Sequence, residues 1–363
     1  MLLDPDGWTL AFQSEDVHAR LPTELRQRVT LETHAAVMEV ATGVHRTAGD
    51  ALAELTGLRE RLANALAAQG LRAAVAGTHP CALASDTLLP SHPRYRQIGE
   101  SMRVLARREP TLATHVHIGV TKPDDAVRLL NRLRAHLPLL LALSANSPFW
   151  RGGQTGFAST RTTLFDAFPR TGLPRSFSCY RDWVATVERL LASGAIADPS
   201  FLWWDARLKP RYGTVEVRIM DGQTTLEEVG ALAALVQALA SVELERNDDP
   251  GLPEASTIEL IEENRFLAAR DGMEARLIEP REGRRVPAIE LLGRIRAECV
   301  RHARRLRSER ELASICRLVE RNGAARQLAH ADGERDLRCV TARLADAYRP
   351  RIKPEQAITA AAS

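Results

Sequence analysis

The segment GTVEVRIMD, residues 213–221, constrains the fold most strongly because polar and apolar side chains alternate along it from Thr214 to Ile219. Successive side chains of a strand point to opposite faces, so one face of this segment is apolar. The other face carries Thr214, Glu216 and Arg218. A half-buried strand normally turns its polar face to solvent, so this segment alone favours an ordinary surface strand.

A second segment, ATHVHIGV at residues 113–120, places His115 and His117 on one face of an otherwise apolar strand. Taken alone, the two histidines also favour structural roles. If both segments belong to one sheet, however, imidazoles, a carboxylate and a guanidinium line a single surface backed by aliphatic side chains. The combination then predicts a site rather than a solvated face.

The segment VMEVAT adds Glu39 to a third apolar strand. A buried carboxylate is costly unless it is paired with a cation or bound to a metal. Oxygen ligands together with an imidazole suit Mg²⁺ or Mn²⁺, which organise phosphates, better than they suit a structural zinc ion. The pattern indicates a metal–nucleotide site and says nothing of the reaction.

Composition excludes several classes of protein. Of the 363 residues, 45% are hydrophobic and 26% are charged, and no apolar run approaches the roughly 18 residues of a membrane span. The net charge of +3 is too small to indicate a nucleic-acid partner. Five scattered cysteines form no CxxC pair, and the start MLLDPDGWTL lacks the features of a signal peptide. We expect a cytoplasmic protein with small-molecule partners, and the sequence leaves a homo-oligomer open.

The order of elements predicts one α+β domain over residues 1–363, with a helical last third. Strands are expected at 35–42 and, as a pair joined by a turn, within 201–221, and a long helix is expected at about 47–68. Three later helices are expected to begin with capping boxes. The paired residues are Thr225 with Glu228, Ser256 with Glu259, and Ser308 with Glu311.

Further polar residues lie in turns and at the ends of elements. The loop 147–161 places three glycines near Thr155, Ser159 and Arg161, and such a loop forms either an anion nest or a plain surface loop. His79 and Asn146 suit turn capping as well as substrate binding. Asp205 suits pairing with an arginine. The chain has no P-loop motif GxxxxGK[ST], which excludes that way of holding phosphate.

Several of these segments together resemble one family. In order and spacing, they are similar to the carboxylate-amine ligases of the glutamate–cysteine ligase type 2 family, over about residues 2–345. The segments that carry the resemblance are GTHP, THVHIGV, LPLLLALSANSPFWRGGQTGFASTR, WWDARLKPRYGTVEVRIMD, ENRFLAARDG and GAARQ. The resemblance implies an antiparallel sheet curved into a funnel and covered by helices, as in the glutamine synthetase fold. It also implies ATP and Mg²⁺ as cofactors.

The resemblance also implies roles for individual residues. The metal and phosphate wall is expected to consist of Glu39, His115, His117 and Glu216. Arg218 and Arg161 are expected to neutralise the transferring phosphoryl group. The substrate and nucleotide rim is expected to include His79, Asn146, Thr155, Ser159 and Asp205.

Family chains open with a strand of the form GVEEEF directly before a segment such as LLDPDG, whereas this sequence starts at Met1, Leu2 and Leu3. We therefore expect that strand and its acidic metal ligands to be missing from the printed chain. Either the strand lies upstream of Met1 or the chain has lost part of its metal site, and the sequence leaves both open.

The expected activity is ATP-dependent formation of an amide bond between an amino-acid carboxylate, typically that of glutamate, and an amine such as that of cysteine. The carboxylate would attack the γ-phosphate of ATP, and the amine would then displace phosphate from the acyl phosphate. Two alternatives stay open. One is an iron oxygenase that uses two histidines and a carboxylate; the other is a non-catalytic protein, derived from such a ligase, that binds nucleotide or amino acid.

Overall fold

The computed structural model describes residues 1–246, 257–279, 282–334 and 336–349. All of its strands are short. They are β1 (Leu2–Asp4), β2 (Thr9–Leu10), β3 (Val29–Leu31), β4 (Met38–Val40), β5 (Arg72–Ala73), β6 (Val116–Gly119), β7 (Phe149–Trp150), β8 (Gly153–Gln154), β9 (Ala206–Lys209), β10 (Thr214–Val217), β11 (Arg276–Ile278) and β12 (Arg285–Pro287).

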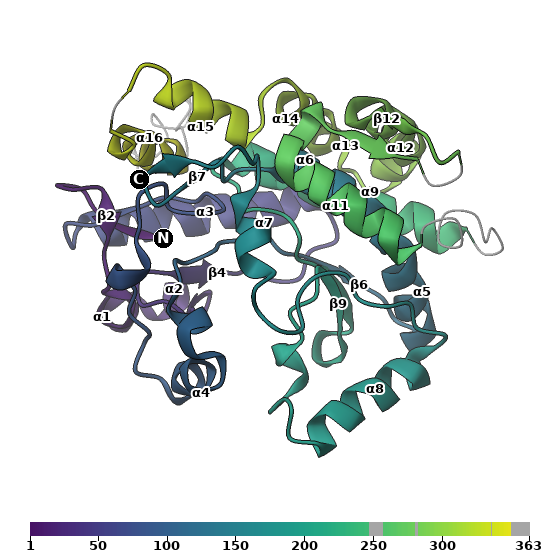
Figure 1. Ribbon diagram of the computed structural model, residues 1–363, viewed down its shortest axis with the longest axis horizontal. Coiled ribbons are helices and arrows are strands. Elements are labelled where there is room, and N and C mark those ends of the chain that lie inside the picture. The colour runs from purple at the N-terminus through teal and green to yellow at the C-terminus, as the bar shows by residue number, and fades with distance from the viewer. Residues whose placement is uncertain (247–256, 280–281, 335, 350–363) are drawn as a thin grey trace, which may run out of the picture.

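Helices make up most of the remaining described chain, and Figure 1 shows their arrangement. They are α1 (Ser14–Arg20), α2 (Thr23–Arg26), α3 (Ala48–Ala67), α4 (Pro93–Met102), α5 (Pro123–Leu133), α6 (Leu137–Ser144), α7 (Thr160–Phe165), α8 (Tyr180–Ala192), α9 (Leu226–Glu245), α11 (Ile258–Asp271), α12 (Ala288–Arg305), α13 (Glu309–Ala313), α14 (Ile315–Arg321), α15 (Gly323–Ala331) and α16 (Arg338–Tyr348). The 3₁₀ turns are η1 (Ala84–Asp86), η2 (Arg103–Arg107), η3 (Arg134–His136), η4 (Pro199–Phe201), η5 (Pro210–Tyr212) and η6 (Gly272–Glu274). None of these described helices is both long and apolar enough to cross a membrane.

The described strands pair in five small antiparallel sheets, with the orders β2-β1-β5, β6-β10-β9, β3-β4, β7-β8 and β11-β12. The predicted α+β class with antiparallel pairing is therefore confirmed. The single funnel-shaped sheet is not seen as one continuous ladder among these residues, because strands of two to four residues end before their ladders can join. The expected strand at 35–42 is shorter than predicted, at Met38–Val40, whereas the long helix, Ala48–Ala67, matches its predicted range closely.

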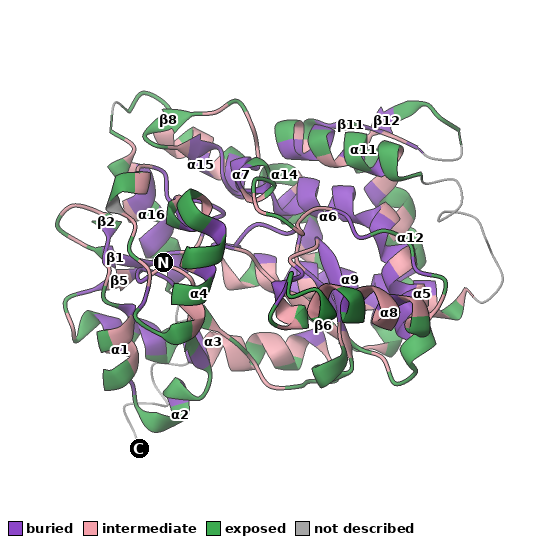
Figure 2. Ribbon diagram, turned by 60° about the horizontal axis from the view of Figure 1, so that its bottom comes forward, coloured by how far each residue is buried: buried purple, intermediate pink, exposed green. Residues whose placement is uncertain are grey.

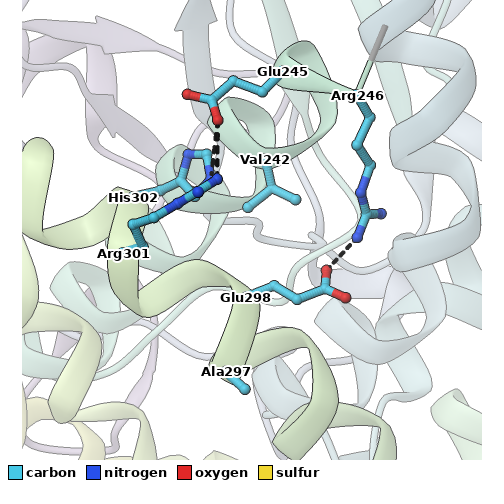
Figure 3. Close-up of a pocket in the computed structure, with 7 residues that line it drawn as sticks. All are labelled: Val242, Glu245, Arg246, Ala297, Glu298, Arg301 and His302. Carbon is cyan, nitrogen blue, oxygen red and sulfur yellow. Dashed lines mark hydrogen bonds and ion pairs between the residues drawn. The ribbon is translucent and has the colours of Figure 1, made fainter. Parts of the chain in front are cut away.

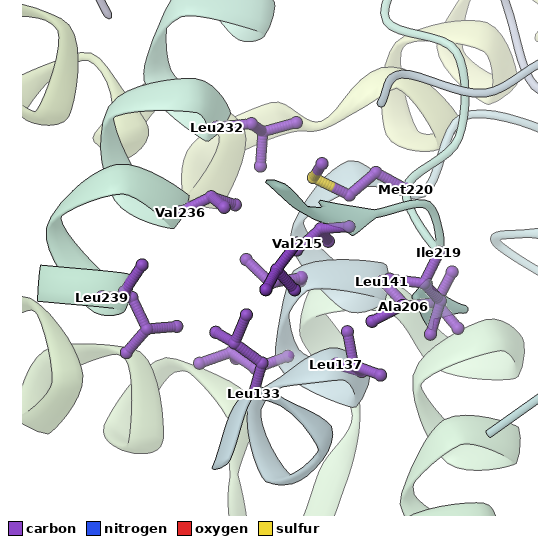
Figure 4. Packing of buried hydrophobic residues seen from close by; sticks show 14 of the residues in the cluster. Leu133, Leu137, Leu141, Ala206, Val215, Ile219, Met220, Leu232, Val236 and Leu239 are labelled. Atoms are coloured by element: carbon purple, nitrogen blue, oxygen red, sulfur yellow. The ribbon is translucent and has the colours of Figure 1, made fainter. Parts of the chain in front are cut away.

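The sheet β6-β10-β9 rests on a helical layer. Val215 and Val217 of β10 are fully buried, and they belong to the same apolar cluster as Leu137 and Leu141 of α6 and Val236 of α9. Figure 4 shows Val215, Leu137, Leu141 and Val236 converging from the strand and from both helices. Burial of apolar side chains contributes about 25 cal/mol per Å² removed from water, so this packing fixes which face of the sheet is inward. The polar face is left pointing away from the helices.

Helix α9 is the centre of this layer. It is apolar around most of its circumference and packs against α3, α5, α12 and α13, as expected of a helix buried on all sides. Figure 2 shows α6 and α9 largely buried, whereas α4 and α11 turn exposed faces outward. The C-terminal third is helical in its described residues apart from the hairpin β11-β12, as predicted.

The three predicted capping boxes have different outcomes. Thr225 accepts a hydrogen bond from the Glu228 backbone N–H, and the Glu228 side chain accepts one from the Thr225 backbone, so the first box is confirmed. Ser308 directly precedes α13 but makes no capping bond, because its backbone (φ −123°, ψ 25°) is not in the extended conformation that aims an N-cap hydroxyl at the helix. The box at Ser256 lies outside the described residues.

This difference predicts unequal effects of two similar substitutions. Thr225→Ala should lower the free energy of unfolding by about 1 kcal/mol, because it removes a capping bond from the central helix. Ser308→Ala should change it by no more than about 0.5 kcal/mol, because no capping bond is lost. Urea unfolding followed by circular dichroism measures both. A loss at Ser308 equal to that at Thr225 would contradict the assignment.

Candidate active site

Three side chains lie side by side on the polar face of the sheet β6-β10-β9. The register places Glu216 of the central strand β10 opposite both His117 of β6 and Arg207 of β9. Directly opposed residues in an antiparallel sheet point to the same face, so these three side chains meet. The two alternating segments therefore belong to one sheet, which is the condition on which the sequence indicated a site. Arg207 was not predicted as a site residue, although its alternation with the apolar neighbours of β9 gives the same signal.

Glu216 is the centre of the cluster and is only 2% exposed. Its Oε2 accepts a hydrogen bond from Arg207 Nε at 2.7 Å, and its Oε1 accepts one from Arg218 Nη1 at 2.6 Å. Burial raises the pKa of the Glu216 carboxyl, but the charges of Arg218, His115 and Arg207 outweigh burial and hold the pKa well below its usual range. Glu216 is therefore a carboxylate at neutral pH, and it fixes two guanidinium groups.

Strand β10 ends in a β-bulge that determines where Arg218 lies. The backbone N–H groups of Arg218 and Ile219 both donate to the carbonyl oxygen of Asp205, at 2.7 and 3.1 Å. Two successive donors on one carbonyl indicate an extra residue in the strand, and such bulges redirect side chains. Pairing with the β6 side resumes at the bridge between Ala113 and Asp221. The bulge thus ends the regular ladder immediately after Val217, one residue beyond Glu216.

Arg161 of α7 supports this bulge. Its Nη1 donates to the carbonyl oxygen of Ile219 at 3.0 Å, and its Nη2 donates to that of Arg218 at 3.3 Å. A buried carbonyl without a partner is costly, so Arg161 stabilises the irregular backbone. Nη1 also lies 3.7 Å from Oδ1 of Asp221. The structure therefore places Arg161 at the backbone that carries Arg218, and its contact with a phosphoryl group stays a prediction.

The two histidines differ in what their ring nitrogens contact. His117 Nδ1 shares a hydrogen bond of 2.9 Å with the Thr214 hydroxyl, and its Nε2 lies 3.7 Å from Oε1 of Glu216. His115 Nδ1 lies 3.5 Å from the same oxygen and 3.8 Å from Oε1 of Glu39. Burial is the main cause that lowers the pKa of His115 to about 4, so its ring is neutral at pH 7. Within the part of the chain that the structure describes, the buried Nε2 of His115 has no hydrogen-bond partner.

The hairpin β3-β4 brings two carboxylates to this side of the cluster. Glu39 of β4 lies opposite Thr30 of β3, and Glu32 follows two residues after Thr30. Burial and the charge of Glu39 raise the pKa of Glu32. The sequence analysis missed Glu32, because the pairing of 29–31 with 38–40 had not been recognised. If those two apolar stretches are taken as the strands of one hairpin, Glu32 is expected to lie near Glu39.

These residues fit a divalent cation at the β3-β4 edge of the cluster. Across the described ranges, no three histidine, cysteine or acidic side chains converge as a formed metal centre. Mg²⁺, however, is commonly held by one or two protein carboxylates and completes its shell with water and substrate phosphates. The like-charged pair Glu32 and Glu39, with the unpartnered Nε2 of His115, supplies such donors. Both oxygens of Glu216, by contrast, already accept bonds from arginines.

Asp221 organises the backbone behind the site, and sequence reasoning did not find it. Its carboxylate accepts hydrogen bonds from Asn146 N at 2.8 Å, Ser147 Oγ at 2.7 Å and Ser159 Oγ at 2.8 Å. The Asn146 side chain is also satisfied, since Gln327 Nε2 donates to its Oδ1 at 2.8 Å. Asn146 and Ser159 are fully buried. The structure places both in this network, and their role at the substrate rim stays a prediction.

The remaining predicted rim residues also have partners within the protein. Thr155 Oγ1 donates to the carbonyl oxygen of Pro148 at 3.1 Å. Asp205 accepts a hydrogen bond from Arg265 Nε at 2.6 Å. Pairing with an arginine was one of the two roles predicted for Asp205. His79 Nδ1 accepts the backbone N–H groups of residues 81 and 82, both at 3.0 Å, and its Nε2 contacts the carbonyl oxygen of residue 8 at 2.9 Å. His79 is therefore a turn-capping residue in this structure.

The glycine-containing loop is a β-hairpin. Its strands β7 and β8 are joined by Arg151 and Gly152, whose φ values are 51° and 78°. Two successive left-handed residues form the tight turn that matches the twist of a hairpin. Gly152 N donates to the carbonyl oxygen of Pro80 at 2.9 Å, so this N–H is not available to an anion nest, one of the two alternatives for the loop.

A surface hollow between α9 and α12 contains none of the predicted site residues (Figure 3). Arg246 pairs there with Glu298 at 2.5 Å, and Arg301 pairs with Glu245 at 3.2 Å. Because these charges are matched, the hollow offers no unpaired group that points to a ligand. The full lining is Val242, Glu245, Arg246, Ala297, Glu298, Arg301 and His302.

Comparison with known proteins agrees with the resemblance of the motifs. The model of the glutamate–cysteine ligase family 2 (GCS2) matches residues 6–342. A protein of Rubrobacter xylanophilus named "Putative glutamate–cysteine ligase 2-1" is 39% identical over 356 residues, which cover 98% of this chain and 94% of that protein. A protein of Sorangium cellulosum named "Putative glutamate–cysteine ligase 2" is 40% identical over 308 residues, which cover 84% and 82%.

Two solved structures share the fold. The glutamate–cysteine ligase of Francisella tularensis in complex with AMP superposes with a TM-score of 0.67 at 13% identity, over 99% of this chain and 89% of that one. A bifunctional glutathione synthetase from Pasteurella multocida gives a TM-score of 0.66 at 13% identity, over 91% and 48%. At such low identity the likeness establishes the fold only.

The capping role of His79 predicts a pH dependence of stability. Burial is the main cause that lowers the pKa of His79 to about 4, below its ordinary 6.5. The unfolded chain therefore binds a proton more readily, so stability is full above about pH 6.5 and falls as the pH drops towards 4. At pH 5 the loss from this group should be about 2 kcal/mol.

Urea unfolding at pH 7.5 and pH 5 tests this dependence. His79→Asn keeps a capping acceptor but cannot titrate, so the variant should lose less stability between the two pH values than the wild type does. An equal loss in the two proteins would show that His79 does not contribute.

Proposed function

This chain belongs to the glutamate–cysteine ligase family 2, and we propose that it is an ATP-dependent carboxylate-amine ligase. The reaction joins an amino-acid carboxylate, the γ-carboxylate of glutamate, to an amine such as that of cysteine. It proceeds through an acyl phosphate formed with the γ-phosphoryl group of ATP. Residues 1–363 act as one catalytic domain in this proposal.

The observation that carries the proposal is the polar face around Glu216. A phosphoryl group in transfer bears negative charge on its oxygens, and catalysis consists mainly of positioning and of neutralising that charge. Arg207 and Arg218 supply two guanidinium groups at fixed positions, because both bind the buried Glu216 carboxylate. Arg218 Nε is buried and has no hydrogen-bond partner among the described residues, so one donor of this guanidinium is unsatisfied.

The proposal assigns the metal wall to Glu39, His115, His117 and Glu216, with Glu32 as an additional carboxylate. Because both oxygens of Glu216 already accept bonds from arginines, Glu216 takes part in this wall by fixing those arginines. A Mg²⁺ or Mn²⁺ ion held there would supply positive charge that neutralises the phosphate oxygens. The chain's own residues set the position of the cation: Glu39 and His115 face each other between two sheets, with 3.8 Å between Oε1 and Nδ1. In this proposal, the sheets β6-β10-β9 and β3-β4 form two parts of the funnel wall.

Positioning of the phosphoryl group falls to Arg218, and Arg161 holds the backbone that carries it. The bulge and the two carbonyl bonds of Arg161 support this division of roles. No side-chain nucleophile is needed, because the substrate carboxylate attacks phosphorus directly. A ligase-derived protein that only binds its ligands is the alternative outcome of the assays below.

The first test is release of ADP by the chain with ATP, Mg²⁺ and glutamate, in the presence and absence of cysteine and other amines. We expect ADP release that depends on the amine, because the acyl phosphate turns over when an amine displaces phosphate. A coupled spectrophotometric assay measures ADP, and mass spectrometry identifies the amide. Binding of ATP and glutamate without ADP release at any metal concentration would instead support the non-catalytic alternative.

The second test replaces the central carboxylate. Glu216→Gln should reduce amine-dependent ADP release by about 100-fold or more, because two guanidinium groups lose the charge that fixes them. Glu243→Gln is the matched control: Glu243 is also buried between arginines and a histidine, with Arg132 at 3.3 Å and His136 at 3.0 Å, but it lies in the helical layer.

Thermal unfolding of both variants checks that each still folds. If Glu243→Gln lost as much activity as Glu216→Gln in folded protein, the assignment of the site to the polar face would be wrong.

A further inference from the structure

Lys209 lies on the same polar face, at the end of the sheet next to the turn between β9 and β10. It belongs to the cross-strand row of residues adjacent to the row of Glu216. The register pairs Thr214 of β10 with Gly119 of β6 on one side and with Lys209 of β9 on the other. This row lies two residues from the row of Glu216, so its side chains point to the same face. The row contains one long cationic side chain and no acidic one.

The ammonium of Lys209 has no counter-charge. Within the described residues, no hydrogen bond or ion pair joins it to another group, and its recorded contact is with the ring of Tyr212, 5.8 Å from Nζ to the ring centre. The same ring lies edge-on to the ring of His117, with 6.2 Å between their centres. Lys209 and His117 therefore flank one aromatic side chain at this end of the face.

The surrounding charge is positive. The carboxylate that acts on Lys209, Glu216, is shared between Arg207 and Arg218. Arg94 of α4, which pairs with Asp198 at 3.4 Å, also acts on Lys209. Burial is the main cause that lowers the pKa of the Lys209 ammonium, and the charges of Arg207, Arg218 and Arg94 lower it further, against an opposing contribution from Glu216. Cations that repel one another around a gap indicate a place where an anion is stabilised.

There is room for such an anion above the row. A Cβ atom placed on Gly119 would meet nothing within 4 Å, so the face is open beside His117 and Thr214. Tyr212 is well exposed and borders the same opening. In the neighbouring row, by comparison, the side chains of Arg207 and Arg218 occupy the space around Glu216.

We propose that Lys209 forms an anion subsite at the turn end of the polar face, beside His117, which binds a phosphate or carboxylate oxygen of a substrate. The inference rests on the proposed function and adds to it a binding residue on β9. The anion comes from one of two sources: the triphosphate of the nucleotide, or a carboxylate of the amino acid. Lys209 donates a charge-assisted hydrogen bond to it.

Calorimetric titration of the full chain distinguishes the two sources without requiring turnover. The probes are ATP with Mg²⁺, inorganic tripolyphosphate, AMP and glutamate. Lys209→Gln should raise the Kd of the bound anion by about tenfold or more, the value of one charge-assisted hydrogen bond. Weaker binding of ATP and tripolyphosphate with unchanged glutamate binding identifies the phosphate source. Weaker binding of glutamate alone identifies the carboxylate source.

Two further variants keep the test specific. Lys209→Arg retains the positive charge and should bind nearly as the wild type does. Lys122→Gln removes the same charge from an exposed lysine directly before α5 and should leave every Kd unchanged. Circular dichroism confirms folding of each variant.

The remaining outcomes overturn the subsite. Unchanged affinities in Lys209→Gln, in a protein whose wild type binds the probes, would refute the subsite and leave the proposed ligase function intact. Equal losses in Lys122→Gln would refute it as well. A wild type that binds none of the probes would refute the subsite and the proposed function together.

Discussion

The ion pairs of Glu216 are the interaction on which the site depends. Burying a carboxylate until it is 2% exposed costs desolvation free energy, and two charge-assisted hydrogen bonds from Arg207 and Arg218 offset that cost. Removing either arginine would leave charge uncompensated, so all three side chains hold one another in place. The pairing therefore holds both guanidinium groups in fixed positions, which long flexible side chains do not adopt by themselves.

The helical layer stabilises this arrangement because α6 and α9 pack against the apolar face of the sheet and fix its position. Val215 and Val217 flank Glu216 in sequence and are fully buried against α6 and α9, so β10 cannot shift by one residue without exposing both. The bulge after β10 then ends the ladder, and Arg161 binds the two carbonyl oxygens there. Packing sets the register, and the register sets which polar groups meet.

Sequence patterns could predict what depends on local periodicity. Alternation along 113–120 and 213–221 predicted the strands, and it placed His117 and Glu216 on one face. What depends on distant parts of the chain was not predictable in this way. Glu32 reaches Glu39 through a hairpin, and the network around Asp221 joins four separated segments. Residue types alone could not show that Asn146 and Ser159 are buried partners of that network rather than surface ligands.

The clusters around Glu216 and Glu243 show why charge alone does not identify a site. Both are buried glutamates that bind arginine and face histidine, yet the bonds of Glu243 to Arg132, His136 and Arg246 occupy both of its oxygens within a packed helical layer. Around Glu216, several polar and charged groups lack partners among the described residues. His115 Nε2 has no hydrogen-bond partner, Glu32 and Glu39 repel each other, and Lys209 has no counter-ion. Natural interiors rarely leave such groups unsatisfied. These groups surround the polar face of the sheet β6-β10-β9, and the proposed function places its ligands there.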